Sequence, residues 1–137
     1  MKTRLIMLVM LMVLITGSIS AQNKVTIVVD GIENIKGQLV VGLYDKETYM
    51  KKPFMGTFKK IEEEVVTVEI ENVPNGEYAV SLFQDENENW KIDTGAFGIP
   101  TEKYGASNNA KGKMGPPKFE DCKFTVDGDI EIYITLI

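Results

Sequence analysis

The sequence predicts an all-β protein, an antiparallel two-sheet β-sandwich with one long ordered loop. Three observations lead to this prediction. Short runs rich in β-branched residues recur along the chain, several of them alternate apolar and polar residues, and no long segment has the period of a helix. About six to eight short strands in a domain of this size are typical of a sandwich. Each sheet would bury its apolar face against the other, because a single open sheet would leave an apolar row exposed to water.

The first strands are predicted over residues 24–30, 37–44 and 65–70. The first two are β-branched runs bordered by glycine, which is a common end point for strands. The third alternates, with apolar residues from Val66 to Ile70 on one face and polar residues on the other. This period of two predicts a strand with one wet face. The segment between the second and third strands is interpreted as a connection.

Two turn signals predict hairpins. Pro-Asn-Gly at residues 74–76 suits a tight turn, because proline presets φ and Asn-Gly supplies positive φ, so the third strand should turn back into a strand over 77–83. Asp-Gly at residues 127–128 predicts a second hairpin, between strands over 122–126 and 129–137. The alternation in these segments favours antiparallel pairing.

Residues 1–21 are predicted to be a secretory signal peptide, followed by a single domain over residues 22–137. Lys2 and Arg4 precede an apolar run over 5–15, and small residues follow it. An uncleaved anchor is the alternative, but 11 apolar residues are too few to cross a bilayer core of about 30 Å as a helix. We therefore expect an exported protein of the periplasm, cell surface or extracellular space, without stable membrane insertion.

Charge and composition exclude several classes of function. The chain has a net charge of −5, no histidine and a single cysteine. Its only arginine is Arg4, so the remaining domain is acidic and arginine-free. This argues against nucleic acid and against anionic membrane surfaces as partners. Cys122 alternates in sequence with Phe124 and Val126, so we interpret it as a small buried apolar residue, the alternative being a reactive or intermolecular thiol.

Residues 85–93 have short oxygen-bearing side chains at every second position, which is the pattern of a calcium-binding loop. Trp90 stands where such loops have the turning glycine, and Ala96 stands where they have the closing glutamate. Any Ca²⁺ affinity should therefore be weak, and the alternative is a turn in which Asp and Asn side chains bond to the backbone. The expected Ca²⁺ ligands are Asp85, Asn87, Asn89, the carbonyl oxygen of Lys91, and Asp93.

Residues 85–120 form a connection that is unusually long for a small domain, and such loops are commonly functional. Its regular aromatic residues favour an ordered loop. We expect Phe97 and Phe119 to pin this loop to the sheets. Trp90 is expected to contact a ligand or to form a local lid, and Tyr104 is the second candidate ligand-binding residue, because aromatic side chains on loops bury a large area at low entropic cost.

Four segments resemble a bacterial exported family called domain of unknown function 2141. They are Val-Pro-Asn-Gly-Glu-Tyr-Ala-Val (73–80), Asp-x-Asn-x-Asn-x-x-x-Asp (85–93), Gly-Ile-Pro-x-Glu-x-Tyr-Gly-x-Ser-Asn-Asn-Ala (98–110) and Gly-Pro-Pro-x-Phe-Glu-Asp (115–121). The resemblance covers nearly the whole expected domain, and the family usually has glycine at the position of Trp90. It implies a fold and no catalytic residues. The turn at 74–76 also resembles prealbumin-like modules, so the sandwich is expected to be immunoglobulin-like or prealbumin-like.

The function that these observations favour is a non-catalytic binding or interaction module with a glycan or protein ligand, with Ca²⁺ as its only expected cofactor. A purely structural accessory domain of the cell envelope is the first alternative. The second is a glycan hydrolase that uses two carboxylates. No pair is selected by spacing, and the candidates are Asp85, Asp93, Glu102 and Asp121.

Overall fold

The computed structural model describes residues 22–137, and the predicted signal peptide lies outside these described residues. Strands make up most of the regular structure. No helix in the described part of the chain is long and apolar enough to cross a membrane. The strands are β1 (Gln22–Asp30), β2 (Gln38–Tyr44), β3 (Met55–Lys60), β4 (Val66–Pro74), β5 (Gly76–Asp85), β6 (Tyr104–Ala106), β7 (Phe124–Val126) and β8 (Ile130–Thr135), and the short helices are η1 (Ala96–Gly98), η2 (Ser107–Asn109) and α2 (Phe119–Cys122).

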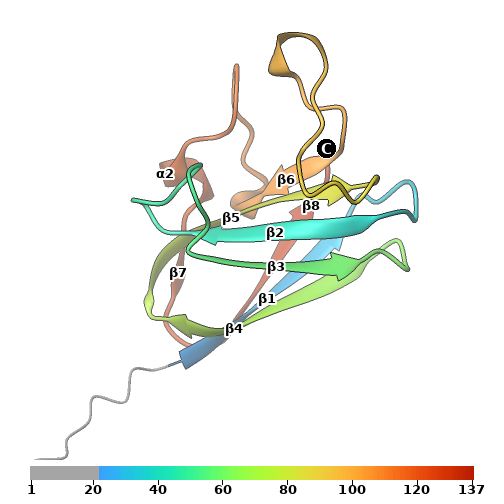
Figure 1. The fold of residues 1–137 in the computed structure, drawn as a ribbon. Helices are drawn as coiled ribbons and strands as arrows, with labels where there is room; N and C mark the ends of the chain where they lie inside the picture. Colours follow the sequence, from blue (N-terminus) through green and yellow to red (C-terminus); the bar gives the residue numbers. More distant parts are fainter. Residues whose placement is uncertain (1–21) are drawn as a thin grey trace, which may run out of the picture.

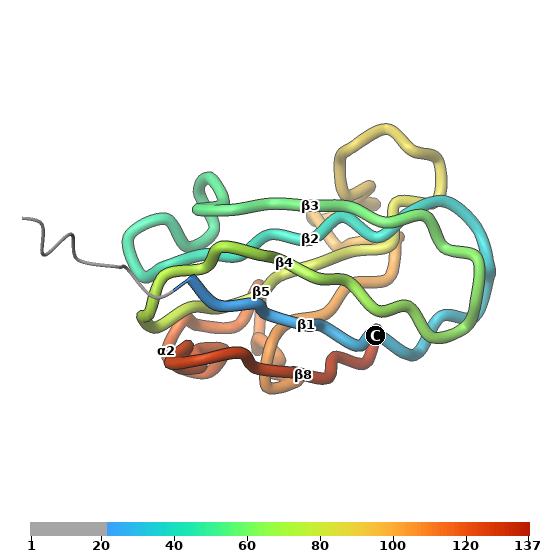
Figure 2. The backbone as a smooth tube through the Cα atoms, turned by 90° about the horizontal axis from the view of Figure 1, so that it is seen from below, coloured from blue at the N-terminus to red at the C-terminus, as the bar shows by residue number. Residues whose placement is uncertain are grey.

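The strands form two sheets that face each other across one apolar core. The smaller sheet has the order β4-β1-β8, and the larger has the order β3-β2-β5-β6, with β7 paired to β5 as well. Figure 1 shows the smaller sheet beneath the larger one, and Figure 2 shows the same arrangement from below. Val25, Ile27 and Val29 of β1 and Leu39 and Leu43 of β2 are fully buried between the sheets. Each such side chain stabilises the fold by about 1.5–3 kcal/mol.

The prediction that all strands pair in antiparallel fashion is wrong for one pair, because β8 runs parallel to β1. Both predicted hairpins are also wrong. The strands on either side of residues 127–128 belong to different sheets, β7 next to β5 and β8 next to β1. Likewise β4 pairs with β1, whereas β5 pairs with β2. A tight turn and an alternating pattern look the same whether the chain returns to the same sheet or crosses to the other one.

One strand, β3, lies within the segment that the sequence pattern predicts to be a connection. It pairs antiparallel with β2 along the edge of the larger sheet. Its sequence hides the strand because Lys59 and Lys60 interrupt the apolar pattern. Lysines are common on edge strands, where they oppose pairing with another chain.

The long connection after β5 is packed onto the larger sheet by a second, smaller apolar cluster. Ala79, Ala106, Phe119 and Cys122 are buried together, and Tyr49 packs against them. The expectation that Phe119 pins the loop is therefore confirmed. The free thiol of Cys122 is fully buried, as predicted, and burial raises its pKa, which disfavours the thiolate form.

The same expectation is wrong for Phe97, whose side chain is 101% exposed. It lies at the tip of the first half of the connection, where its backbone has a φ of 58°. Instead of packing on the sheets, the ring points away from the protein.

Candidate functional site

Asp85 is the last residue of β5 and its side chain is fully buried. The carboxylate accepts hydrogen bonds from the backbone N–H groups of Asn89 (3.1 Å) and Trp90 (2.8 Å), and from the side-chain amide of Gln38 (3.1 Å). Three donors therefore compensate the burial of this charge. The carboxylate fixes the first turn of the loop onto the sheet.

The second half of the loop is closed by Asp93. The side-chain amides of Asn87 and Asn89 donate to its two carboxylate oxygens, at 2.6 and 2.8 Å. The oxygen of each amide accepts a backbone N–H two residues further on, in Asn89 and Lys91 respectively. These are the local side-chain-to-backbone bonds of Asx turns. The structure thus brings together the four predicted ligand side chains, and Lys91 takes part through its N–H.

Glu102 lies opposite this loop and is 8% exposed. Its two carboxylate oxygens accept the backbone N–H groups of Glu86 (3.1 Å) and Asp93 (2.9 Å), one at each end of the loop. Burial raises the pKa of Glu102, and the neighbouring charges of Asp93 and Asp85 act in the same direction, against the two hydrogen bonds. Glu102 therefore acts as a clamp that holds the two ends of the loop together.

The oxygens of this loop are engaged by protein N–H groups rather than directed at a common point. Within residues 22–137, no group of three His, Cys, Asp or Glu side chains is arranged to hold a metal ion. A cation would have to displace the amide groups of Asn87 and Asn89 from Asp93. The calcium site stays a prediction, and its donor set of carboxylate and amide oxygens is of the type that Ca²⁺ prefers.

Trp90 makes the turn that glycine makes in calcium loops, since its φ is 65°. Such a conformation is strained for a large side chain. The indole packs edge to face against Phe58 of β3, with ring centroids 4.8 Å apart and an interplanar angle of 83°. Next to this pair, Lys60 and Glu88 form an ion pair at 3.0 Å. The loop is therefore fastened to the edge strand of the larger sheet.

Phe58 begins a row of apolar side chains that crosses the outer face of the larger sheet. It is paired in register with Val40 of β2, Val40 with Phe83 of β5, and Phe83 with Tyr104 of β6. We call this row together with Trp90 the aromatic stripe. Its four strands are about 4.8 Å apart, so the row is roughly 14 Å long. Phe58, Trp90 and Tyr104 remain 52%, 54% and 37% exposed.

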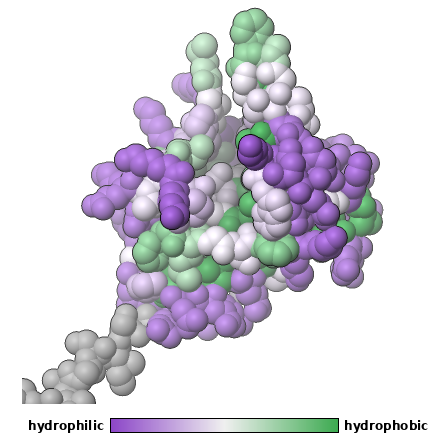
Figure 3. Space-filling model, viewed as in Figure 1, coloured by the Kyte–Doolittle hydropathy of each residue, from purple (hydrophilic) through white to green (hydrophobic). Residues whose placement is uncertain are grey.

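The neighbouring row on the same face consists of small residues. Gly56, Gly42, Ser81 and Ala106 are paired in register across the same four strands. The ring of Tyr44 lies over Gly42, and Ala106 is buried in the cluster with Phe119 and Cys122, so this row is partly covered by neighbouring side chains. Figure 3 shows two loops that rise from the same side of the molecule, with lower-lying surface between them.

The two predicted ligand-binding residues, Trp90 and Tyr104, lie at opposite ends of the stripe. Sequence reasoning missed Phe58 and Phe83, which connect them. The signal for Phe83 was present in the strand over 77–83, but its partners could be found only from the register of the strands. Phe58 was hidden because β3 was interpreted as a connection.

The carboxylates proposed for a hydrolase do not form an accessible pair. Asp85 is buried, both oxygens of Glu102 accept backbone N–H groups, and Asp121 belongs to α2 in another part of the long connection. The fourth candidate, Asp93, is half-buried, and its two oxygens accept the side-chain amides of Asn87 and Asn89.

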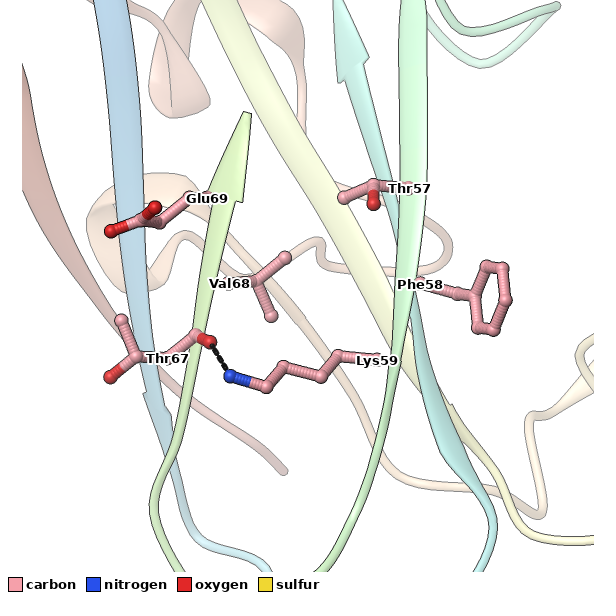
Figure 4. Close-up of a pocket in the computed structure, with 6 residues that line it drawn as sticks. All are labelled: Thr57, Phe58, Lys59, Thr67, Val68 and Glu69. Carbon is pink, nitrogen blue, oxygen red and sulfur yellow. Dashed lines mark hydrogen bonds between the residues drawn. The ribbon is translucent and has the colours of Figure 1, made fainter. Parts of the chain in front are cut away.

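A separate depression of about 400 Å³ lies between the edge strands β3 and β4. Figure 4 shows Val68 pointing into it and Phe58 pointing away. The side-chain amine of Lys59 crosses it and donates to the carbonyl oxygen of Thr67 at 2.7 Å. The lining offers few groups for chemistry, and the lysine is typical of a protected sheet edge.

Comparison with known proteins places the chain in a family without giving it an activity. A family model described as "Uncharacterized protein conserved in bacteria (DUF2141)" matches residues 27–133. No curated protein and no solved structure was found to match the chain. The resemblance to prealbumin-like modules therefore finds no support among these comparisons.

Proposed function

The chain belongs to this bacterial family, and we propose that it is an exported, non-catalytic module that binds a glycan on the aromatic stripe. In this proposal residues 22–137 form a single β-sandwich, and residues 1–21 direct its export. The observation that carries the proposal is the register of four strands, which places Tyr104, Phe83, Val40 and Phe58 in one row and leaves Trp90 at its end.

The shape of the stripe favours an oligosaccharide over a compact ligand. Aromatic side chains present flat apolar surfaces on which the apolar faces of sugar rings can stack. A row roughly 14 Å long exceeds a single sugar ring and suits a short chain of them. Polar groups for sugar hydroxyls lie beside the row, in the ion pair of Lys60 and Glu88 and in the half-buried hydroxyl of Ser81. The strands make this surface rigid, so little conformational entropy is lost on binding.

A binding role fits the chemistry of the neighbouring carboxylates better than hydrolysis does. The two buried carboxylates near the stripe, Asp85 and Glu102, use their oxygens to hold the loop. A glycoside hydrolase needs one free carboxylic acid and one free carboxylate on either side of the substrate. In this proposal Asp85 and Glu102 therefore stabilise the loop that carries Trp90.

Calcium has a structural part in this proposal. Ca²⁺ held by Asp85, Asn87, Asn89, the Lys91 carbonyl oxygen and Asp93 would replace the bonds between the two asparagines and Asp93. It would stabilise the turn that carries Trp90 without touching the glycan. With only two carboxylates the affinity should lie in the weak extracellular range, with a dissociation constant of about 10⁻⁴–10⁻³ M.

A glycan array tests the proposal. The purified protein should bind a subset of oligosaccharides, and Trp90→Ala and Tyr104→Ala should each lose most of this signal. Tyr133→Ala is the matched control, because Tyr133 is an exposed aromatic residue (64%) on β8 of the other sheet. An array without hits, or equal binding by all four proteins, would reject glycan recognition by the stripe and favour a structural accessory domain.

A further inference from the structure

Two loop tips carry large apolar side chains that are mostly or fully exposed to solvent. Tip 1 is residues 94–101, and tip 2 is residues 110–118. Phe97 and Ile99 of tip 1 are 101% and 64% exposed, and Met114 of tip 2 is 107% exposed. Both tips rise from the same side of the molecule (Figures 1 and 3). Large apolar side chains that are this exposed together mark a contact surface.

Tip 1 is held in shape by its own backbone. Gly95 donates its N–H to the carbonyl oxygen of Ile99 (2.7 Å), and Thr101 donates to that of Asp93 (2.8 Å). Phe97 and Gly98 at the turn both have positive φ, 58° and 69°. Glycine adopts this conformation readily, whereas phenylalanine does so at a cost. In this turn the ring is exposed to solvent, so no contact within the protein offsets the cost.

Tip 2 is anchored at its base and free beyond it. Tyr49 donates its hydroxyl to the carbonyl oxygen of Pro117 (2.7 Å). The side-chain amide of Asn108 donates to the carbonyl oxygens of Asp121 (3.2 Å) and Lys123 (2.9 Å). Met114 therefore extends from a base that is fixed to the larger sheet.

The charge of the tips is opposite to that of the whole chain. The protein has 20 Asp and Glu residues, yet tip 1 is uncharged and tip 2 contains three lysines and no acidic residue. Lys111, Lys113 and Lys118 are exposed, and within the described residues none of them forms an ion pair, unlike Lys46, Lys103 and other lysines elsewhere. Net charge alone predicts avoidance of anionic surfaces. Salt screens charges that lie further than about 10 Å from a surface. The local charge of the tips, rather than the net charge, therefore determines whether an anionic surface attracts or repels the protein.

We propose that the two tips dock the protein on an anionic lipid bilayer. Phe97, Ile99 and Met114 enter the boundary between headgroups and acyl chains, and the lysines of tip 2 contact lipid phosphates. A lipid surface fits better than a protein partner because the tips are separate projections. A protein would need two matched depressions at the right separation, whereas a fluid bilayer adapts to both. The attachment is peripheral and reversible, and it uses residues outside the aromatic stripe.

Vesicle flotation tests this docking with the full-length mature protein. Vesicles of phosphatidylethanolamine with phosphatidylglycerol should retain the protein, and purely zwitterionic phosphatidylcholine vesicles should not. The double variant Phe97→Ser/Met114→Ser should lower the partition coefficient by at least about tenfold. Lys113→Gln should lower it about fivefold, since one lysine near an anionic surface contributes that much. Raising the salt concentration should weaken binding further.

Matched controls separate docking from loss of folding and from glycan binding. Tyr133→Ser removes an exposed aromatic residue and Lys36→Gln an exposed lysine outside the tips, and both should partition like the wild type. The substituted side chains of Phe97, Lys113 and Met114 are exposed, so the tip variants should also keep the wild-type unfolding midpoint. Trp90→Ala should still bind vesicles. Failure of the wild type to bind anionic vesicles, equal binding to both lipid compositions, or unchanged binding by the tip variants would overturn the proposal, and a protein partner would then be the better occupant.

Discussion

The rings of Phe58 and Trp90 pack edge to face, with centroids 4.8 Å apart. Phe58 belongs to an edge strand and Trp90 to the loop after β5, so this contact joins two segments that are far apart in the sequence. It also accounts for a large residue at a φ of 65°. The strain of that conformation is offset by the contact with Phe58, and the indole is held at the end of the aromatic stripe.

Phe58→Ala should destabilise the protein through this contact. An aromatic pair contributes about 0.5–1.5 kcal/mol beyond the area that it buries, and Phe58 is half exposed, so we expect a loss of about 1–2 kcal/mol in the free energy of unfolding. Urea denaturation measures it. Tyr133→Ala, which removes an exposed ring on the other sheet, should change the free energy by less than about 0.5 kcal/mol. Equal effects of the two substitutions would show that the Phe58–Trp90 contact contributes nothing specific.

Asp85→Ala should be more damaging than Asp93→Ala. Removal of the Asp85 carboxylate takes the acceptor from the partly buried N–H of Trp90 and from the buried side-chain amide of Gln38, and leaves the N–H of Asn89 with only its longer bond to Asn87. We expect a cost of about 2–4 kcal/mol in total. Asp93 is only half-buried, and water can replace it as the acceptor for the two asparagine amides. Its loss should cost about 1 kcal/mol or less. Chemical denaturation of both variants gives the comparison, and the reverse order would contradict the role assigned to Asp85.

Calcium should raise the melting temperature of the wild type. At a Ca²⁺ concentration about ten times a millimolar dissociation constant, the stabilisation RT ln(1 + [L]/Kd) is about 1.4 kcal/mol, which corresponds to several degrees for a domain of this size. Chelator should reverse the shift, and Mg²⁺ at the same concentration should produce a smaller one, because it loses its water ligands reluctantly. An Asp93→Ala variant should not respond. If the wild type has the same melting temperature in Ca²⁺ and in chelator, the loop does not bind Ca²⁺.

Glu102 should make stability depend on pH. Its pKa is raised in the folded protein, first by burial, so the ionised form is less favourable in the folded state than in the unfolded state. The stabilisation that comes from this shift is fully present below the ordinary glutamate pKa of about 4.3 and is lost as the pH rises through the raised pKa. The stability of the wild type relative to Glu102→Gln should therefore fall as the pH rises from about 4 through the raised pKa of Glu102.

Urea denaturation of the wild type and of Glu102→Gln at several pH values measures this difference. The same series on Glu62→Gln, an exposed glutamate in the turn before β4, corrects for the loss of a carboxylate on the surface. If the free energy of unfolding of the wild type instead rises with pH relative to that of Glu102→Gln, the prediction is wrong. The hydrogen bonds from Glu86 and Asp93 would then outweigh the burial of Glu102.

The fold class could be predicted from local patterns, but the partners of the strands could not. Alternation from Val66 to Ile70 shows that one face is buried, and it is the same for parallel and antiparallel neighbours. The parallel pairing of β8 with β1 depends on where the chain crosses between sheets, and no local signal marks the crossing at residues 127–128. Edge strand β3 escaped notice for a related reason, since the lysines that protect an edge also interrupt its apolar pattern.

The site was predictable in its residue types and not in its bonding. The spacing of Asp85, Asn87, Asn89 and Asp93 singled out a loop whose side chains hydrogen-bond to one another and to the loop backbone in the structure. The spacing could not show that Asp85 is fully buried, or that the side-chain amides of Asn87 and Asn89 donate hydrogen bonds to Asp93. Phe97 shows the opposite case. Because Phe97 is apolar, it is expected to be buried. Only the tertiary structure shows that the loop holds its ring away from any apolar surface of the protein.

Calorimetric titration with a series of oligosaccharides of increasing length tests the central claim, that the stripe binds glycans, most directly. Affinity should rise with each added sugar ring until the chain spans the stripe from Tyr104 to Trp90, and then level off. Tyr104→Ala and Trp90→Ala should each weaken the longest ligand by about tenfold, as expected for the loss of one aromatic contact, and Tyr133→Ala should not. An affinity independent of length, or a loss with Tyr133→Ala equal to that of the stripe variants, would contradict glycan binding along this row.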